Sequence, residues 1–170
     1  YTSSGYPPLG IVIQAVTGKS FEDFVVERIF KPAGMTDTRY KHQEEVVRNR
    51  AGGYVEQAGV FQLGEPLRPR LIAPSGGIMS TAVDMAKWQI ALARGALVRP
   101  ATLGQMVTPL RTNDGRTFDA GFAWFIDTFR GHRLWLHNGS TVTGYSSVVC
   151  WYPDDQLGVG VTRRAAEGLQ

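Results

Sequence analysis

The sequence predicts an α+β fold, in which an antiparallel sheet meander packs against helices within a single domain of 170 residues. Apolar residues recur at helical spacing in the part of the chain up to about residue 110. From about 118 to 163 the pattern changes to short β-rich runs separated by turn residues, which predicts about four consecutive strands. Helices first and strands afterwards place the helices on one face of the sheet. A content of 43% apolar and 11% aromatic residues is enough to build a core.

The first helical segments have recognisable start and stop signals. Pro7 and Pro8 suit the first turn of a helix whose apolar run ends at Gly18, a typical left-handed cap. We expect this helix to be buried. Ser20 can cap a second helix by accepting a hydrogen bond from an amide three residues later, and Pro32 ends that helix. Together the two segments predict a helical hairpin.

Residues 41–72 differ from the segments on either side. They mix charge, glycine and proline with no sustained period, which predicts a long irregular excursion with a short strand at 53–55. A loop of this length usually shapes a site or covers one.

Two more helices are predicted between this excursion and the strands. Thr81 followed by Asp84 resembles a capping box with Asp in place of Glu, and Gly95 closes the helix that it opens. A shorter helix is predicted over residues 100–107, where Pro109 follows as a stop.

Composition and charge exclude several classes of protein. The net charge is +3, but the arginines are dispersed and no helix carries a basic stripe, so no nucleic-acid partner is expected. Cys150 is the only cysteine, which excludes a disulfide framework and favours a buried structural thiol. His132 and His137 are five positions apart in a predicted strand and therefore point to opposite faces. Neither a metal site nor a cofactor is expected, and the sequence does not indicate a compartment.

Three blocks, read in order, resemble a known family. They are YTSSGYPPLGIVIQAVTGKSFEDFVVERIFKPAGMTDT, APSGGIMSTAVDMAKW and LHNGSTVTGYSSVVCWYPDDQLGVGV. The chain resembles the serine β-lactamase superfamily, in the branch of class C β-lactamases, D-alanyl-D-alanine carboxypeptidases and related esterases. The resemblance covers about residues 1–162, is most specific in the first forty, and implies a β-lactamase/transpeptidase-like fold.

That superfamily uses three motifs, of which this chain holds the third and a variant of the second with Ser3 in place of Asn. They are a Ser-x-x-Lys nucleophile, a Tyr-x-Asn segment, and a Lys-Thr-Gly or His-x-Gly segment on a strand. No serine in this chain has a lysine three residues later. In the family the nucleophile and the first strands precede the tyrosine motif, and a helix follows the last strand. We therefore expect an incomplete domain, the C-terminal portion of a longer hydrolase, that is inactive alone.

The resemblance implies that Tyr1 and His137 are catalytic. Tyr1 would act as general base or acid, which requires neighbouring cations because a free tyrosine has a pKa of about 10. His137 would donate to a substrate carboxylate or ester oxygen and add positive charge when protonated. This hypothesis requires the two side chains to converge on one pocket. From the residues alone, a His before Asn-Gly is more typical of a strand end leading into a type I′ turn.

Ser3, Gly139 and Ser140 are implied to bind substrate. Ser3 stands where the family usually has Asn, and a hydroxyl, with a single donor, is less suited to recognising an amide. Alternatively, Thr2 to Ser4 form only a helix-entry turn. Gly139 would let the backbone approach the substrate, and the Ser140 amide would be one donor of the oxyanion hole. The four tryptophans are best interpreted as core or sheet-facing residues, although one could line the acyl pocket.

Two functions follow from these implications. The first is a serine hydrolase that forms an acyl-enzyme with a small-molecule ester, peptide or other amide, or β-lactam. The second is a non-catalytic binding or assembly module of the same fold, which the missing nucleophile motif allows. Without the family's first strands and last helix, a sheet edge and an apolar face are exposed, so self-association is expected.

Overall fold

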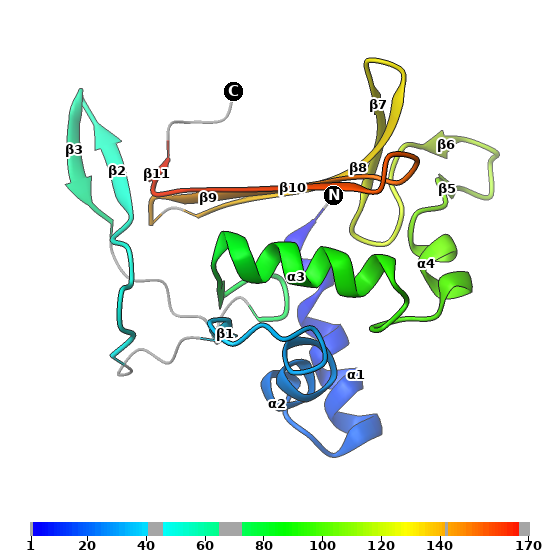
Figure 1. Cartoon of the computed structure of the whole chain (residues 1–170), viewed down its shortest axis with the longest axis horizontal. Helices are drawn as coiled ribbons and strands as arrows, with labels where there is room; N and C mark the ends of the chain where they lie inside the picture. The colour runs from blue at the N-terminus through cyan, green and yellow to red at the C-terminus, as the bar shows by residue number, and fades with distance from the viewer. Residues whose placement is uncertain (1, 41–45, 65–72, 142, 167–170) are drawn as a thin grey trace.

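The protein consists of helices on one side of an antiparallel sheet (Figure 1), as the sequence predicts. The computed structural model describes residues 2–40, 46–64, 73–141 and 143–166. The helices are η1 (Ser3–Gly5), α1 (Pro7–Thr17), α2 (Phe21–Val25), η2 (Val26–Phe30), α3 (Ala82–Ala93) and α4 (Pro100–Met106). The strands are β1 (Arg39–Tyr40), β2 (Tyr54–Gln57), β3 (Val60–Leu63), β4 (Ile78–Met79), β5 (Leu110–Arg111), β6 (Thr117–Phe118), β7 (Phe125–Phe129), β8 (His132–Thr141), β9 (Tyr145–Tyr152), β10 (Leu157–Arg163) and β11 (Ala165–Ala166). Within the described ranges, no helix combines the length and apolar character needed to cross a membrane.

The main sheet has the order β10-β9-β8-β7, and each neighbouring pair is antiparallel. The predicted meander of four strands is therefore confirmed. Arg130 and Gly131 join β7 to β8 in a two-residue turn, and both have positive φ angles, 51° and 86°. This geometry matches the right-handed twist of the paired strands.

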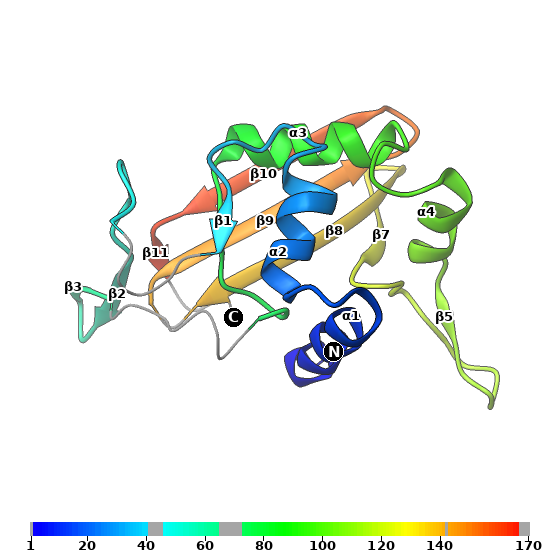
Figure 2. The ribbon, with the colours of Figure 1, turned by 90° about the horizontal axis from the view of Figure 1, so that it is seen from below.

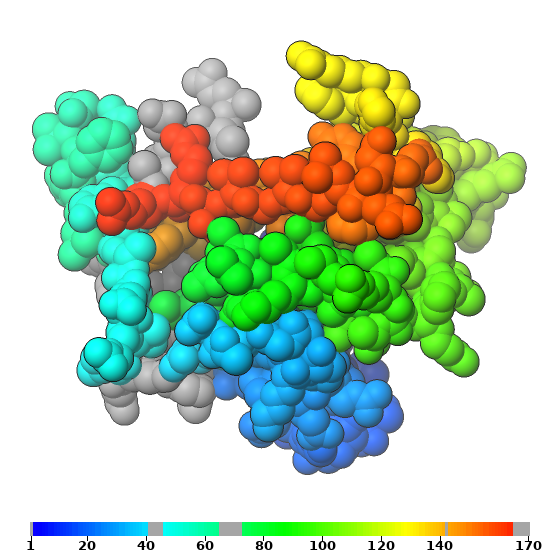
Figure 3. All heavy atoms as spheres, in the orientation of Figure 1, coloured from blue at the N-terminus to red at the C-terminus, as the bar shows by residue number. Residues whose placement is uncertain are grey.

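Helix α3 packs directly on the sheet beside β10 (Figure 3). A Cβ at Gly158 would lie 2.9 Å from Gln89 Oε1, and one at Gly160 would lie 3.8 Å from the Cβ of Met85. Gln89 is buried, and its Nε2 donates to the carbonyl oxygen of Cys150 at 2.8 Å. The glycines of β10 therefore leave the space that lets the helix and its buried amide approach the sheet.

The predicted signals of the last two helices are confirmed. Thr81 Oγ1 accepts a hydrogen bond from the Asp84 amide at 3.1 Å, and Gly95 follows the helix with a φ of 72°. Helix α4 begins at Pro100 and ends within one residue of the predicted boundary. The Asp84 carboxylate, however, does not complete a capping box.

Asp84 instead joins α3 to the turn that precedes β1. Its side chain is fully buried and accepts hydrogen bonds from the Asp37 amide at 2.7 Å, Thr38 Oγ1 at 2.9 Å and Lys87 Nζ at 2.8 Å. Lys87 also donates to the carbonyl oxygen of Gly34 at 2.9 Å. Burial alone raises the pKa of Asp84, but the hydrogen bonds outweigh it and hold that pKa below its usual value.

A compact apolar cluster lies where α2 and η2 meet α3. Its buried members are Val25, Phe30, Ala33, Met35, Tyr40 and Ala91. The Tyr40 ring contacts Phe21 edge-on at 5.8 Å and stacks on Phe30 at 6.4 Å between centroids. Burial raises the pKa of Tyr40 because its anion would lose hydration there. This cluster fixes the η2–β1 turn against α3.

Helix α1 has the predicted bounds but not the predicted burial. Gly18 ends it with a φ of 69°, and the Ser20 hydroxyl accepts from the Asp23 amide at 3.1 Å to begin α2. Gly10 is the only buried residue of α1, whereas Ile11 and Val16 are 71% and 80% exposed. The prediction of a buried helix is wrong for the described residues. Helix α1 lies at the edge of the molecule (Figure 2), and Leu9, Ile11, Val12 and Val16 are exposed.

The described part of the 41–72 excursion contains a β-hairpin. Strand β2 starts one residue later than the predicted strand, and β3 pairs with it through a turn at Ala58 and Gly59, both with positive φ. The second strand was not predicted, since Ala-Gly is not a typical type I′ turn pair. Residues 41–45 and 65–72 lie outside the described ranges.

The face of the main sheet opposite α3 carries exposed apolar side chains. Trp151 of β9 and Gln89 of α3 line one cavity, so alternation along the strand places the half-buried Cys150 on the opposite face. Its thiol is therefore less enclosed than predicted, although desolvation still raises its pKa. Leu157, Val159 and Val161 of β10, which alternate with the glycines facing α3, are exposed on that same outer face.

Candidate active site

The two ends of the predicted site are described to different extents. Tyr1 lies outside the described residues, so its predicted convergence with His137 stays a prediction. Ser3 is exposed in the short helix η1, and its carbonyl oxygen accepts from the Tyr6 amide at 3.2 Å. The hydroxyl oxygens of Thr2 and Ser4 lie 2.7 Å apart and form a hydrogen bond. Ser3 thus lies in a helix-entry turn, which leaves its side chain accessible.

His137, Gly139 and Ser140 lie together in strand β8. They pair with Val149, Ser147 and Ser146 of β9, respectively. Asn138 and Gly139 are therefore inside a strand, and the alternative of a type I′ turn at this dipeptide is wrong. The chain turns only after Thr141, because the ladder with β9 continues to that residue.

The two halves of β8 differ in their pairing. Strand β7 pairs with β8 from His132 to Leu136 and stops there, whereas β9 pairs as far as Thr141. Within the described ranges, the segment from Asn138 onward therefore has a ladder partner on the β9 side alone. Asn138, Gly139 and Ser140 are also exposed. This half of β8 is an accessible sheet edge.

Gly139 is not required by the packing of the described residues. A Cβ at this position would meet Ser147 Oγ at 3.5 Å, an ordinary van der Waals distance. By contrast, a Cβ at Gly53 or Gly64 would lie 2.1 or 2.2 Å from a backbone oxygen. Gly139 also has no positive φ. The absence of a side chain here leaves room above an exposed strand, which is the environment a bound substrate needs.

The two histidines of β8 have separate surroundings, as their odd spacing predicts. His137 is half-buried and stacks on the Phe125 ring with centroids 5.6 Å apart. His132 Nδ1 lies 2.8 Å from a carboxylate oxygen of Asp155, at the other end of the strand. In the part of the chain that is described, no group of three His, Cys, Asp or Glu side chains could hold a metal ion.

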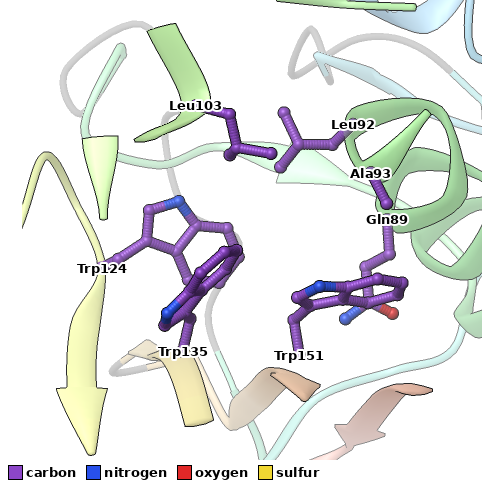
Figure 4. Close-up of a pocket in the computed structure, with 7 residues that line it drawn as sticks. All are labelled: Gln89, Leu92, Ala93, Leu103, Trp124, Trp135 and Trp151. Atoms are coloured by element: carbon purple, nitrogen blue, oxygen red, sulfur yellow. The ribbon is translucent and has the colours of Figure 1, made fainter. Parts of the chain in front are cut away.

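Three of the four tryptophans line a small internal cavity (Figure 4). Trp124, Trp135 and Trp151 surround about 10 Å³ together with Gln89 and Leu92 of α3, among others. Trp88 stacks on Trp124 with centroids 5.9 Å apart. A cavity of this size holds about one water molecule, which is too small for an acyl group. These positions agree with core and sheet-facing roles, and Trp135 also borders a second pocket of about 340 Å³ together with Leu103 and Pro153.

The sequence analysis missed Tyr145, which lies next to the candidate site. Its hydroxyl donates to the carbonyl oxygen of Ala51 at 2.7 Å, across 94 positions of the chain. Its only sequence signal is an aromatic residue directly after the Thr143-Gly144 turn, and that pattern does not indicate a partner so far away.

The fold and the exposed His-Asn-Gly strand are those of a serine β-lactamase/transpeptidase-like protein. The model of the Beta-lactamase family matches residues 1–167, and the chain belongs to that family. The resemblance seen in the sequence is thereby confirmed.

Three known proteins illustrate the similarity. Penicillin-binding protein 4* of Bacillus subtilis (strain 168) is 29% identical over 167 residues, which are 91% of this chain and 37% of that protein. The octameric penicillin-binding protein homologue from Pyrococcus abyssi superposes with a TM-score of 0.82 at 26% identity, covering 98% of this chain and 38% of the other. A D-stereospecific amidohydrolase from Streptomyces sp. shares the fold, with a TM-score of 0.82, 22% identity and coverage of 97% and 50%. The chain spans about a third of the length of the curated relatives it matches.

Proposed function

We propose that this chain is part of a serine hydrolase that forms an acyl-enzyme with an ester, amide or β-lactam. The observation that carries the proposal is the His-Asn-Gly-Ser segment, which forms an exposed strand edge where sequence rules alone favour a turn. Membership in the Beta-lactamase family supports the reaction class. The nucleophile would come from a Ser-x-x-Lys motif in a longer protein, since the 170 residues hold no such motif.

The candidate residues would divide the work of acyl transfer. The Ser140 amide would donate to the oxygen of the attacked carbonyl, where negative charge develops in the transition state. His137 would donate to an ester or carboxylate oxygen of the substrate, supported by its stacking on Phe125. Tyr1 would exchange protons with the nucleophile and the leaving group.

Esters are the favoured substrates within this proposal. Ser3 offers one hydroxyl where an Asn side chain would offer both a carbonyl and an NH2 group. A substrate amide would then leave one of its hydrogen-bonding groups without a partner, which costs binding energy in a desolvated site. An ester has no N–H group to satisfy and loses less.

The first test compares the 170-residue chain with the longer protein that includes the Ser-x-x-Lys motif. Both are incubated with nitrocefin and a p-nitrophenyl ester, and turnover and mass increase are measured. We expect acylation and turnover of the longer protein, with the ester preferred, and neither with the isolated chain. Stable acylation of the isolated chain would contradict the assignment of a nucleophile outside it.

A second test uses the two histidines of β8 as a matched pair in the longer protein. His137→Ala removes a group of the proposed site and is expected to lower kcat/KM about a hundredfold. His132→Ala makes the same change at the other end of the strand, beside Asp155, and is expected to leave kcat/KM within about twofold. Equal effects of the two variants would remove His137 from the site.

The non-catalytic alternative can be distinguished from the hydrolase by the coding sequence upstream. A binding or assembly module of this fold is favoured by the lack of a Ser-x-x-Lys motif in the 170 residues. The coding sequence upstream separates the two functions, because a Ser-x-x-Lys some tens of residues before Tyr1 is required by the hydrolase and not by the module.

We also propose that the isolated chain associates with itself through the main sheet. Strand β10 is an edge strand among the described residues, and its outer face exposes Leu157, Val159 and Val161. Unpaired backbone groups and an apolar face together favour pairing with a second chain. Light scattering is expected to show particles larger than a monomer, and a concentration-independent monomer would contradict this.

A further inference from the structure

The turn that follows the candidate strand lies in backbone contact with the base of the β2–β3 hairpin. Cβ atoms at Gly53 and Gly64 would lie 2.1 and 2.2 Å from the carbonyl oxygen of Thr143. A Cβ at Gly144 would lie 2.1 Å from the carbonyl oxygen of Tyr54. Such approaches are too close for any side chain, so all three positions require glycine. At these three positions the hairpin and the turn therefore meet backbone against backbone, and the Tyr145 ring packs beside Gly53.

Hydrogen bonds also hold the turn and the hairpin together. Tyr145 Oη donates to the Ala51 carbonyl oxygen at 2.7 Å, and Gly64 N donates to Gly53 O at 2.9 Å to close the hairpin base. Within the turn, Thr141 Oγ1 accepts from the Tyr145 amide at 3.2 Å. The turn is thus tied internally by Thr141 and externally by Tyr145.

The candidate oxyanion segment depends on these ties because of how β8 is paired. Strand β7 begins at Phe125, opposite Leu136, so its pairing with β8 does not reach the backbone at Ser140. The described structure supports that segment through β9 on one side and through the turn that follows. An oxyanion donor is effective only when it is already oriented before the reaction, because reorientation during the reaction costs energy.

We infer that Tyr145 is a positioning residue that holds the Ser140 amide in orientation through its hydrogen bond to Ala51. The inference rests on the proposed function, since it assigns the Ser140 amide to the oxyanion hole. Tyr145 does not touch the reacting atoms in this scheme. It fixes the turn to the hairpin, and the turn fixes the end of β8.

The sharpest variant removes one hydroxyl. Tyr145→Phe keeps the ring and deletes the bond to Ala51, so a looser Ser140 amide is expected to lower kcat about tenfold and leave KM within about twofold. The matched control is Tyr152→Phe on the same strand. The Tyr152 hydroxyl forms no hydrogen bond with the described residues, so kcat and KM should stay unchanged.

A steric pair tests the same contact independently. Gly64→Ala places a Cβ 2.2 Å from the Thr143 carbonyl oxygen and must push the hairpin away from the turn, so a larger fall in kcat is expected. Gly104→Ala is its control, because a Cβ there meets nothing within 4 Å.

The variants are made in the longer protein that carries the nucleophile, with a p-nitrophenyl ester as substrate. The burst of p-nitrophenol titrates the active sites, so kcat is expressed per functional site, and hydrogen exchange is followed in residues 139–145. Lower kcat per site with faster exchange in Tyr145→Phe, and neither in Tyr152→Phe, supports the inference.

Two results overturn it, and they can be told apart. If Tyr145→Phe lowers only the melting temperature or the fraction of titratable sites, with kcat per site unchanged, the residue is merely structural and the proposed function stands. If the wild-type protein neither acylates nor turns over, the proposed function fails and this inference fails with it.

Discussion

Helices α1 and α3 are both apolar and nearly equal in length, with 11 and 12 residues, yet they are buried very differently. Helix α3 lies between the sheet and the α2–η2 cluster, and four of its residues are buried. Helix α1 buries only Gly10 against the rest of the described chain and exposes most of its apolar side chains. Both helices are followed by a glycine of positive φ, and α3 alone of the two has a side-chain cap at its N-terminus. A cap satisfies backbone groups at a helix end and does not cover the helix faces, so capping does not account for the difference.

The difference shows that burial is decided by the number of surfaces that meet a helix. Helix α3 meets glycines of β10 on one side and the Phe30–Tyr40 cluster on the other. Its buried Asp84 and Gln89 find polar partners on those two sides, at the η2–β1 turn and on β9. An apolar face gains free energy only when another surface excludes water from it.

The largest test of this comparison deletes a side chain from each region. Phe30→Ala, at a position 4% exposed, is expected to lower the free energy of unfolding by about 3–5 kcal/mol, because it leaves a cavity beside Tyr40. Ile11→Ala, on the exposed face of α1, should change it by less than about 0.5 kcal/mol. Urea unfolding followed by tryptophan fluorescence measures both. A loss of several kcal/mol for Ile11→Ala would show that α1 is covered in solution, and the comparison would break.

The next test removes the charge that links α3 to the η2–β1 turn. Asp84→Asn keeps the shape of the side chain but replaces one acceptor oxygen by an NH2 group, so the bonds from Thr38 and Lys87 cannot all be kept. We expect a loss of about 2 kcal/mol in the free energy of unfolding. Asp119→Asn, at an exposed position, is the matched control and should be nearly neutral. Equal losses would remove Asp84 from the role assigned to it.

The same carboxylate predicts a dependence of stability on pH. The pKa of Asp84 is lower in the folded protein than in the unfolded chain, so the folded state binds its proton less readily. Its stabilisation is complete above the unfolded pKa, about 4, and is lost as the pH falls through the lower folded pKa. Urea midpoints between about pH 5 and pH 2 should fall less steeply for Asp84→Asn than for the wild type. The slope will not vanish, because Glu27, Asp114 and Asp154 also have lowered pKa values.

Features set by neighbouring residues could be predicted from the sequence, and features set by distant contacts could not. The ends of α1 and α3 follow from Gly18, Thr81 and Gly95, which act within one turn of helix. The exposure of α1 depends on which surfaces reach it, and no local pattern encodes that. Strand β3 was missed because Ala58 adopts a positive φ that its residue type does not favour.

The candidate site shows the same division. A local rule favours a turn at Asn138-Gly139, but seven ladder pairs with β9 keep the dipeptide extended. The family resemblance identified the His-Asn-Gly strand because it compares whole blocks and not single dipeptides. The tie between Tyr145 and Ala51 spans 94 positions, so only the folded chain reveals it.

The smallest expected effect lies at the one point where α1 is packed. A Cβ at Gly10 would lie 3.4 Å from Pro74 Cδ and 3.7 Å from Phe21 Cβ, which is close to ordinary contact. Gly10→Ala should therefore fit and should raise the free energy of unfolding by about 0.5–1 kcal/mol, because a helix-interior glycine is replaced. Gly10→Leu has no space and should push α1 away from Phe21 and lower stability. If Gly10→Leu were as stable as Gly10→Ala, the contact of Gly10 with Pro74 and Phe21 would not hold α1 in place.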